Sequence, residues 1–268
     1  MGARFSLKDL WPLSFFLGVE VIPTVIGLFL SQHRYIIDLL QQYNMHEAKP
    51  MPTPLAASTS LHLGSGSPLF DGSSYRRLLG SLQYLALTCP DLCFARALSL
   101  HAYWADDRST CIRTTSYLVF LGSNPISCHA TKQKAIARSS TKAEYRALAF
   151  LASELVWVRN LLSELGVSGI GSLGLFCDNI GATYLSLNPI LHSCMKHIAV
   201  DLHFVRDLVD QKILHVSHIS SQDQLADGLT KALSIARFSN LCSKIGVADG
   251  TSILRGRVKA TVSQASST

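Results

Sequence analysis

The chain has 268 residues, of which 48% are hydrophobic and 16% are charged, and it carries a net charge of +6 with a pI near 9.0. This apolar content provides material for a buried core and excludes a wholly disordered protein. The modest basic excess is compatible with a nucleic-acid partner, but it does not identify one, because phosphate contacts require clustered Lys and Arg side chains.

The first apolar segment, residues 12–30, is long enough to be weighed as a membrane helix. Glu20, two prolines and two glycines interrupt it, and Val, Ile and Phe are frequent in it. This composition favours two strands over residues 15–30, joined by a turn at Pro23 and Thr24. We therefore expect a hairpin and no membrane span.

The following segments up to residue 98 alternate between helical and irregular patterns. Apolar residues recur at helical spacing over residues 33–45, which predicts an amphipathic helix. Residues 49–74 are rich in Pro, Ser and Gly and are typical of an extended connector. Residues 73–98 begin with a Ser cap and carry a helical stripe, which Pro90 divides into two helices.

From residue 100 the pattern is that of an α/β domain, a mixed sheet with helices on its faces. The expected elements are a strand at 100–103, two strands within 116–133 with a turn at Asn124–Pro125, a helix at 139–166, a strand at 173–179, helices at 179–189 and 197–212, a strand at 213–221 and a helix at 224–246. The polar tail is expected to be disordered.

The seven cysteines are odd in number and irregular in spacing. Cys89 and Cys93 are four residues apart and have no matching second pair, which argues against a zinc ribbon. Most cysteines lie in apolar runs, so we expect free, buried thiols in a reducing, intracellular compartment. The first ten residues are charged and lack an apolar core, so we expect no secretory signal.

Three acids lie at positions from which a metal site can form. Glu144 is in the first turns of the helix at 139–166, Asp178 ends a strand, and Asp227 begins the last helix. Strand ends and helix starts meet at one edge of an α/β sheet, and carboxylates are the ligands that Mg²⁺ prefers. Each acid alone has an ordinary alternative: a first-turn position for Glu144, a turn for Asp178, and a cap or a pair with Lys231 for Asp227.

The segments around these acids, ARSSTKAEYRALA, CDNIGA and QLADGLTKAL, closely resemble the RNase H domain in the Pol polyprotein of copia-type LTR retrotransposons. Earlier segments, including FSLKDLWPLSFFLGVEV and YRRLLGSLQYLALTCPDLCFA, are similar to the tail of its reverse transcriptase, beyond the polymerase acids. The resemblance implies a reverse transcriptase remnant at 1–98, an RNase H-like domain at 99–248 with a mixed sheet flanked by helices, and a disordered tail at 249–268. DNA synthesis by this chain is not expected.

By this resemblance, Glu144, Asp178 and Asp227 correspond to the second, third and fourth metal-binding acids. The family activity would be cleavage of the RNA strand of an RNA–DNA hybrid with two Mg²⁺ or Mn²⁺ ions and no small-molecule cofactor. The residues expected to contact nucleic acid are Lys132, Lys134, Arg138, Lys196, His197 and Arg206. A zinc site at His192, Cys194 and His197 is the alternative for that stretch, although it lacks a paired ligand motif.

The chain departs from the family where the first metal-binding acid belongs. The family strand continues into an Asp-Ala-Asp-Trp motif, whereas here Tyr103 is followed directly by Trp104. Asp106 and Asp107 lie several residues further on. Each residue of a strand advances the chain by about 3.3 Å, so these carboxylates would be displaced from the metal ions by more than metal coordination tolerates. We therefore expect an inactive or weak nuclease. The alternatives are a non-catalytic nucleic-acid-binding module and a remnant without function.

Overall fold

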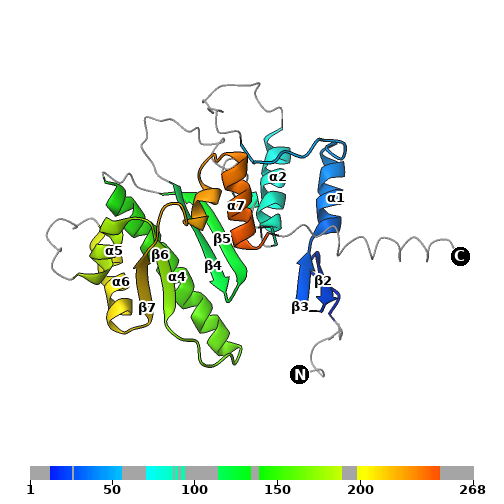
Figure 1. Ribbon diagram of the computed structural model, residues 1–268. Helices are drawn as coiled ribbons and strands as arrows, with labels where there is room; N and C mark the ends of the chain where they lie inside the picture. Colours follow the sequence, from blue (N-terminus) through cyan, green and yellow to red (C-terminus); the bar gives the residue numbers. More distant parts are fainter. Residues whose placement is uncertain are drawn as a thin grey trace, which may run out of the picture.

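The computed structural model describes residues 13–25, 27–55, 71–86, 88–89, 92–93, 114–133, 139–188 and 198–247. The expected strand at 100–103, the domain boundary at 98–99 and the tail from 249 lie outside these ranges. Figure 1 shows the first three strands and two helices on one side, and the remaining strands and helices beside them.

The first apolar segment forms strands, as predicted, but it has three where two were expected. Strands β1 (Phe15–Phe16), β2 (Val19–Thr24) and β3 (Gly27–Ser31) pair antiparallel in the order β1-β2-β3. The turn follows Thr24, which pairs with Gly27, so Pro23 belongs to β2 rather than to the turn. In the part of the chain that the structure describes, no helix has the length and apolar character needed to cross a membrane.

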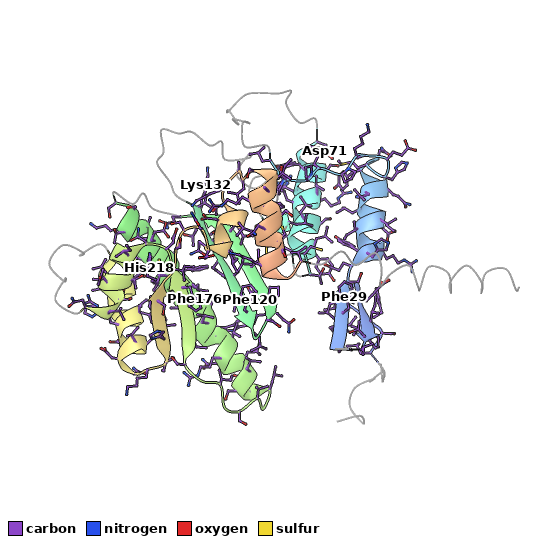
Figure 2. All side chains as sticks on the ribbon, viewed as in Figure 1. Phe29, Asp71, Phe120, Lys132, Phe176 and His218 are labelled. Atoms are coloured by element: carbon purple, nitrogen blue, oxygen red, sulfur yellow. A yellow bond between two sulfur atoms is a disulfide. The ribbon has the colours of Figure 1, made fainter. Side chains whose placement is uncertain are left out.

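Helices α1 (His33–Gln42) and α2 (Gly72–Leu85) are held together by side-chain contacts. The Tyr43 hydroxyl donates to the Ser74 carbonyl at 3.2 Å, and the Tyr35 and Tyr84 rings meet edge to face. Helix α2 begins one residue earlier than expected. Its cap is the Asp71 carboxylate (Figure 2), which accepts from two backbone N–H groups, and not a serine.

Strands β4 (Thr114–Leu121) and β5 (Asn124–Lys132) form an antiparallel hairpin. The turn uses Gly122, whose φ of +63° suits glycine, so Asn124 and Pro125 lie in β5 and not in the turn as predicted. On one face, the Tyr117 ring stacks on His129 and packs against Phe150 of α4.

The other face of this hairpin carries a small core that joins the two halves of the chain. Cys93, Ala130 and Leu229 are buried there, and Ala86 at the end of α2 packs against them. Cys93 and Cys128 form a disulfide. The expectation of free thiols is therefore wrong for these two cysteines, because the fold brings residues 35 positions apart into contact. Cys89, Cys177 and Cys242 belong to no disulfide of the described residues; Cys177 is buried, as expected, whereas Cys89 and Cys242 are only partly buried.

The main core surrounds the long helix α4 (Ser140–Glu164), which packs against both β4 and β6. Strands β6 (Leu173–Cys177) and β7 (Leu214–His218) pair in parallel, and helices α5 (Ile180–Leu187) and α6 (Ala199–Asp210) complete this layer. The most buried core side chains are Tyr145, Ala152, Leu175, Ala182, Ile198, Leu202, Val205, Leu214 and Val216.

The protein is thus a mixed α/β structure with small sheets. Within the described ranges, no hydrogen-bonded pairing joins the β4–β5 pair to the β6–β7 pair. The single helix predicted over residues 224–246 is wrong. It is divided into a 3-10 helix, η4 (Leu225–Leu229), and α7 (Ile235–Ile245), which the Ser234 side chain caps. The Ser116 hydroxyl, which donates to the Ala226 carbonyl at 3.1 Å, holds η4 against β4.

Candidate metal and nucleic-acid site

The three acids singled out in the sequence line one cavity of about 290 Å³, which we call the acid cavity. Glu144 comes from α4, Asp178 follows β6, and Asp227 lies in η4. The remaining lining residues are Thr114, Thr115, Ser116, Gln133, Ala143, Ala147, Gln224, Ala226, Thr230 and Lys231. Residues more than eighty positions apart in the chain therefore share one polar recess.

The side-chain caps of α4 and α5 determine the positions of Glu144 and Asp178. The Ser139 side chain accepts from the Lys142 N–H and starts α4, which puts Glu144 in the second turn. Strand β6 ends at Cys177, so Asp178 stands at its carboxyl end. The Asn179 side chain then accepts from the Ala182 N–H at 2.9 Å and starts α5. The sequence changes from strand to helix within three residues, and this leaves Asp178 half-buried at the carboxyl end of β6.

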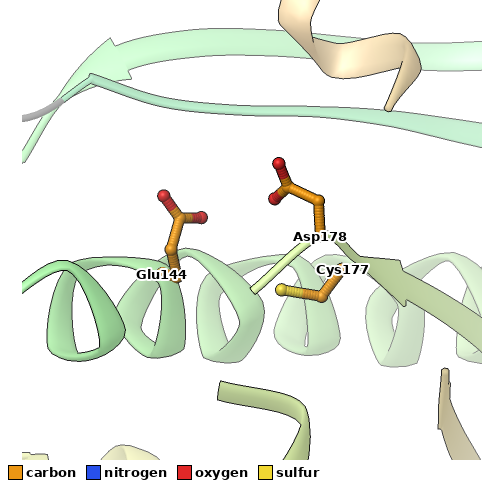
Figure 3. Close-up of side chains that lie close together, drawn as sticks. All are labelled: Glu144, Cys177 and Asp178. Carbon is orange, nitrogen blue, oxygen red and sulfur yellow. The ribbon is translucent and has the colours of Figure 1, made fainter. Parts of the chain in front are cut away.

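Glu144, Cys177 and Asp178 bring one ligand atom each within 4.8 Å of one another (Figure 3). Metal–oxygen and metal–sulfur bonds are about 2.0–2.3 Å long, so donors this close can surround a single ion after small side-chain adjustments. The Ser221 hydroxyl donates to Asp178 Oδ2 at 3.0 Å and orients that carboxylate. The two carboxylates suit a hard ion such as Mg²⁺ or Mn²⁺.

Cys177 is a neighbour of the acids that our sequence interpretation missed. The sequence analysis expected only a free, buried thiol here, because most of the cysteines lie in apolar runs. Burial, together with the nearby charges of Glu144 and Asp178, raises the pKa of the Cys177 thiol to about 11. The thiol is therefore protonated at neutral pH, which makes it a weak nucleophile and a weak ligand.

Two cationic side chains bind Asp227. Its side chain is only 8% exposed, Lys231 Nζ lies 2.7 Å from Oδ1, and an Arg237 amino nitrogen lies 3.2 Å from Oδ2. The pair with Lys231 that the sequence offered as the simpler alternative for Asp227 is present, although Lys231 lies beyond the end of η4 and Asp227 does not cap α7. Within the described residues, Asp227 lines the acid cavity but is not a member of the close group of ligand atoms.

The basic residues expected to contact nucleic acid fall into three groups. Lys134, Arg138, Lys196 and His197 lie outside the described residues, as do His192, Cys194 and the segment from Tyr103 to Asp107. Lys132, at the end of β5 (Figure 2), is half-buried and lines a second cavity of about 730 Å³ with Arg146, Phe150 and Phe204. Arg206 forms the third group.

Arg206 is 7% exposed, so we remove it from the expected nucleic-acid contacts. Its Nε donates to the Leu185 carbonyl at 3.1 Å, and an amino nitrogen donates to the Asn188 carbonyl. These carbonyls lie at the end of α5, where a helix has no internal donors left. The sequence showed a basic residue on an amphipathic helix, but it did not show that this position faces α5.

Replacing Gly181 with alanine is expected to lower the free energy of unfolding by about 1–3 kcal/mol. An added Cβ would lie 2.9 Å from Thr141 Oγ1 and 3.1 Å from Thr141 Cγ2, forcing α5 away from the start of α4. Urea denaturation measures the effect. Thr141→Ala in the same chain should restore most of the loss, and Gly171→Ala, where nothing lies within 4 Å, should be nearly neutral. Equal losses with and without Thr141 would contradict this contact.

The fold and the site together define the class: a mixed α/β protein in which acids from separate elements line one cavity. No protein-family model and no solved structure matches the chain. Similar curated proteins are the retrovirus-related Pol polyproteins from transposons RE1 and RE2 of Arabidopsis thaliana. Each is 44% identical over 290 residues, covering 92% of this chain and 20% of the polyprotein.

The Pol polyprotein from transposon TNT 1-94 of Nicotiana tabacum is 30% identical over 91% of this chain and 22% of its own length. An uncharacterized mitochondrial protein of Arabidopsis thaliana is 34% identical over 59% of this chain and 83% of its own length. The chain belongs to the retrovirus-related Pol polyproteins of copia-type retrotransposons. It spans about a fifth of the length of the Pol polyproteins that it matches.

Proposed function

We propose that residues 99–248 are an RNase H-like domain that binds an RNA–DNA hybrid and cleaves its RNA strand very slowly, with Mg²⁺ or Mn²⁺. The observation that carries this proposal is the gathering of Glu144, Asp178 and Asp227 in one cavity, in the chain order of the family acids. The packing of α4 against an antiparallel pair and a parallel pair of strands supports an RNase H-like fold.

The side chains have separate tasks in this proposal. Glu144 and Asp178 hold the metal ion, and the ion supplies Lewis-acid stabilisation of the scissile phosphate. Ser221 orients Asp178 by its hydrogen bond. Lys231 lines the acid cavity and is more than half exposed, so the N–H groups that Asp227 does not use can donate to a phosphate oxygen. Cleavage is slow because the family acid that would complete the ligand set is missing at the Tyr103–Trp104 junction.

The second candidate function is a nucleic-acid-binding module without cleavage. The pairing of Asp227 with two cations favours it, because a carboxylate so neutralised adds little to metal binding. Hybrid binding that weakens steeply with salt, in a chain that shows no metal-dependent cleavage, would select this function.

In a direct test, the whole chain and its Asp178→Asn variant are incubated with a labelled RNA–DNA hybrid in Mg²⁺ or Mn²⁺. We expect slow cleavage of the RNA strand by the chain and only background cleavage by the variant, because the ion loses one of its two carboxylates. Asp223→Asn is the matched control, since that acid is exposed and pairs with Lys244. Equal cleavage by the chain and by Asp178→Asn would refute the nuclease. Rapid cleavage that Asp178→Asn abolishes would refute the impairment.

A further inference from the structure

We propose that the disulfide between Cys93 and Cys128 is a reversible redox clamp. In its oxidised form it ties Cys93, which lies beyond α2, to the β4–β5 hairpin and holds η4 against that hairpin, and a dithiol reductant releases both. The inference is independent of the proposed nuclease, because neither cysteine is among the described residues that line the acid cavity.

The place of the disulfide in the fold carries the first step. Cys93 follows α2 in the chain and Cys128 lies in β5, so the bond joins residues 35 positions apart. Cys93 is fully buried in the small core, together with Ala130 of β5 and Leu229 of η4. The packing around the disulfide therefore also positions η4.

The size of this small core carries the second step. Among the described residues it has three buried side chains, against fourteen in the main core around α4. The free energy gained by burial scales with the apolar area removed from water, so a core this small contributes little of it. The covalent bond is therefore a large share of what holds the hairpin, η4 and Cys93 together.

Thiol–disulfide exchange supplies the release step. The thiolate of a dithiol reductant attacks Cys128 Sγ, because Cys128 is only partly buried whereas Cys93 is fully buried. The S–S bond breaks, Cys93 leaves as a thiolate and takes up a proton, and the reductant is joined to Cys128 as a mixed disulfide. The second thiol of the reductant then attacks the reductant's own sulfur in this mixed disulfide. The Cys128 thiol is freed, and the dithiol is oxidised to a cyclic disulfide.

The reduced form has a hydrogen-bond acceptor for one of the two thiols. Cys128 Sγ lies 3.5 Å from the carbonyl oxygen of Ala86, the residue that caps the end of α2, so the freed thiol can donate to it. A thiol is a weak donor, and this contact replaces the covalent bond only in part. We therefore expect the reduced chain to keep its main core while η4 and the hairpin open more often.

The test compares hydrogen exchange in the oxidised whole chain and in the same chain reduced with dithiothreitol, measured by mass spectrometry. Reduction should accelerate exchange in η4 and in the β4–β5 hairpin at least about tenfold more than in α6, whose buried side chains belong to the main core. Equal acceleration in η4 and α6, or none in η4, would overturn the inference. Cys89→Ser is the matched control, because it keeps the Cys93–Cys128 pair and should respond as the unmodified chain does.

Two single variants separate the two sulfurs, with oxidised glutathione as the probe and peptide mapping to locate it. Cys93→Ser should form a mixed disulfide at Cys128, whereas Cys128→Ser should form none at the buried Cys93. Thermal denaturation of each variant confirms that it is folded. A mixed disulfide at Cys93 in Cys128→Ser, or no peptide that links Cys93 to Cys128 in the air-oxidised unmodified chain, would overturn the inference.

Discussion

Replacing Arg206 with alanine is expected to lower the free energy of unfolding by about 3 kcal/mol. The guanidinium is buried and donates to the Leu185 and Asn188 carbonyls at the end of α5. The substitution leaves both acceptors without this donor and opens a gap between α6 and α5. Urea denaturation of the whole chain, followed by circular dichroism, measures the loss.

Matched variants make this result specific. Arg34 is exposed on α1, so Arg34→Ala should change the free energy of unfolding by less than about 0.5 kcal/mol. Arg206→Lys keeps the charge but lacks the planar fork that reaches two carbonyls, so it should recover only part of the stability. If Arg206→Ala instead weakened hybrid binding and left stability unchanged, the side chain would be a nucleic-acid contact and the structural role would be wrong.

Elements with a clear period were predictable from the sequence. The helix α4 has a Ser cap and an apolar stripe, and the strands β4, β5, β6 and β7 are short apolar runs bounded by turn residues. The first apolar segment was also correctly assigned to strands. Its length alone would suit a membrane helix, but its prolines and β-branched residues favour strands. Local sequence was sufficient to predict an element wherever its own residues determine whether it forms a helix or a strand.

Features that depend on distant contacts were not predictable in the same way. The helix expected over residues 224–246 is divided: η4 packs against β4, and the Ser234 side chain starts α7. The disulfide between Cys93 and Cys128 and the burial of Arg206 against α5 follow from tertiary packing. The three acids were found through their flanking motifs, whereas Cys177 was missed, because an apolar run indicates a buried thiol but not its neighbours in the fold.

The central proposal is that Glu144 and Asp178 are part of a nuclease site that lacks one acid of the family. Inserting Asp-Ala-Asp between Tyr103 and Trp104 would introduce the motif that the resemblance leads us to expect at this junction. The added carboxylate should increase Mg²⁺-dependent cleavage by at least about 100-fold, because it completes the ligand set around the ion. Asn-Ala-Asn at the same junction is the matched control, since it has the same length and no charge.

The decisive measurement is therefore the rate at which each inserted chain cleaves a labelled RNA–DNA hybrid in Mg²⁺, with its unfolding midpoint measured in parallel. We predict rapid cleavage by the Asp-Ala-Asp chain, background cleavage by the Asn-Ala-Asn chain, and a return to background when Asp178→Asn is added to the former. Cleavage by the Asp-Ala-Asp chain no faster than by the Asn-Ala-Asn chain, at equal stability, would contradict the claim that a lost acid is what limits this site.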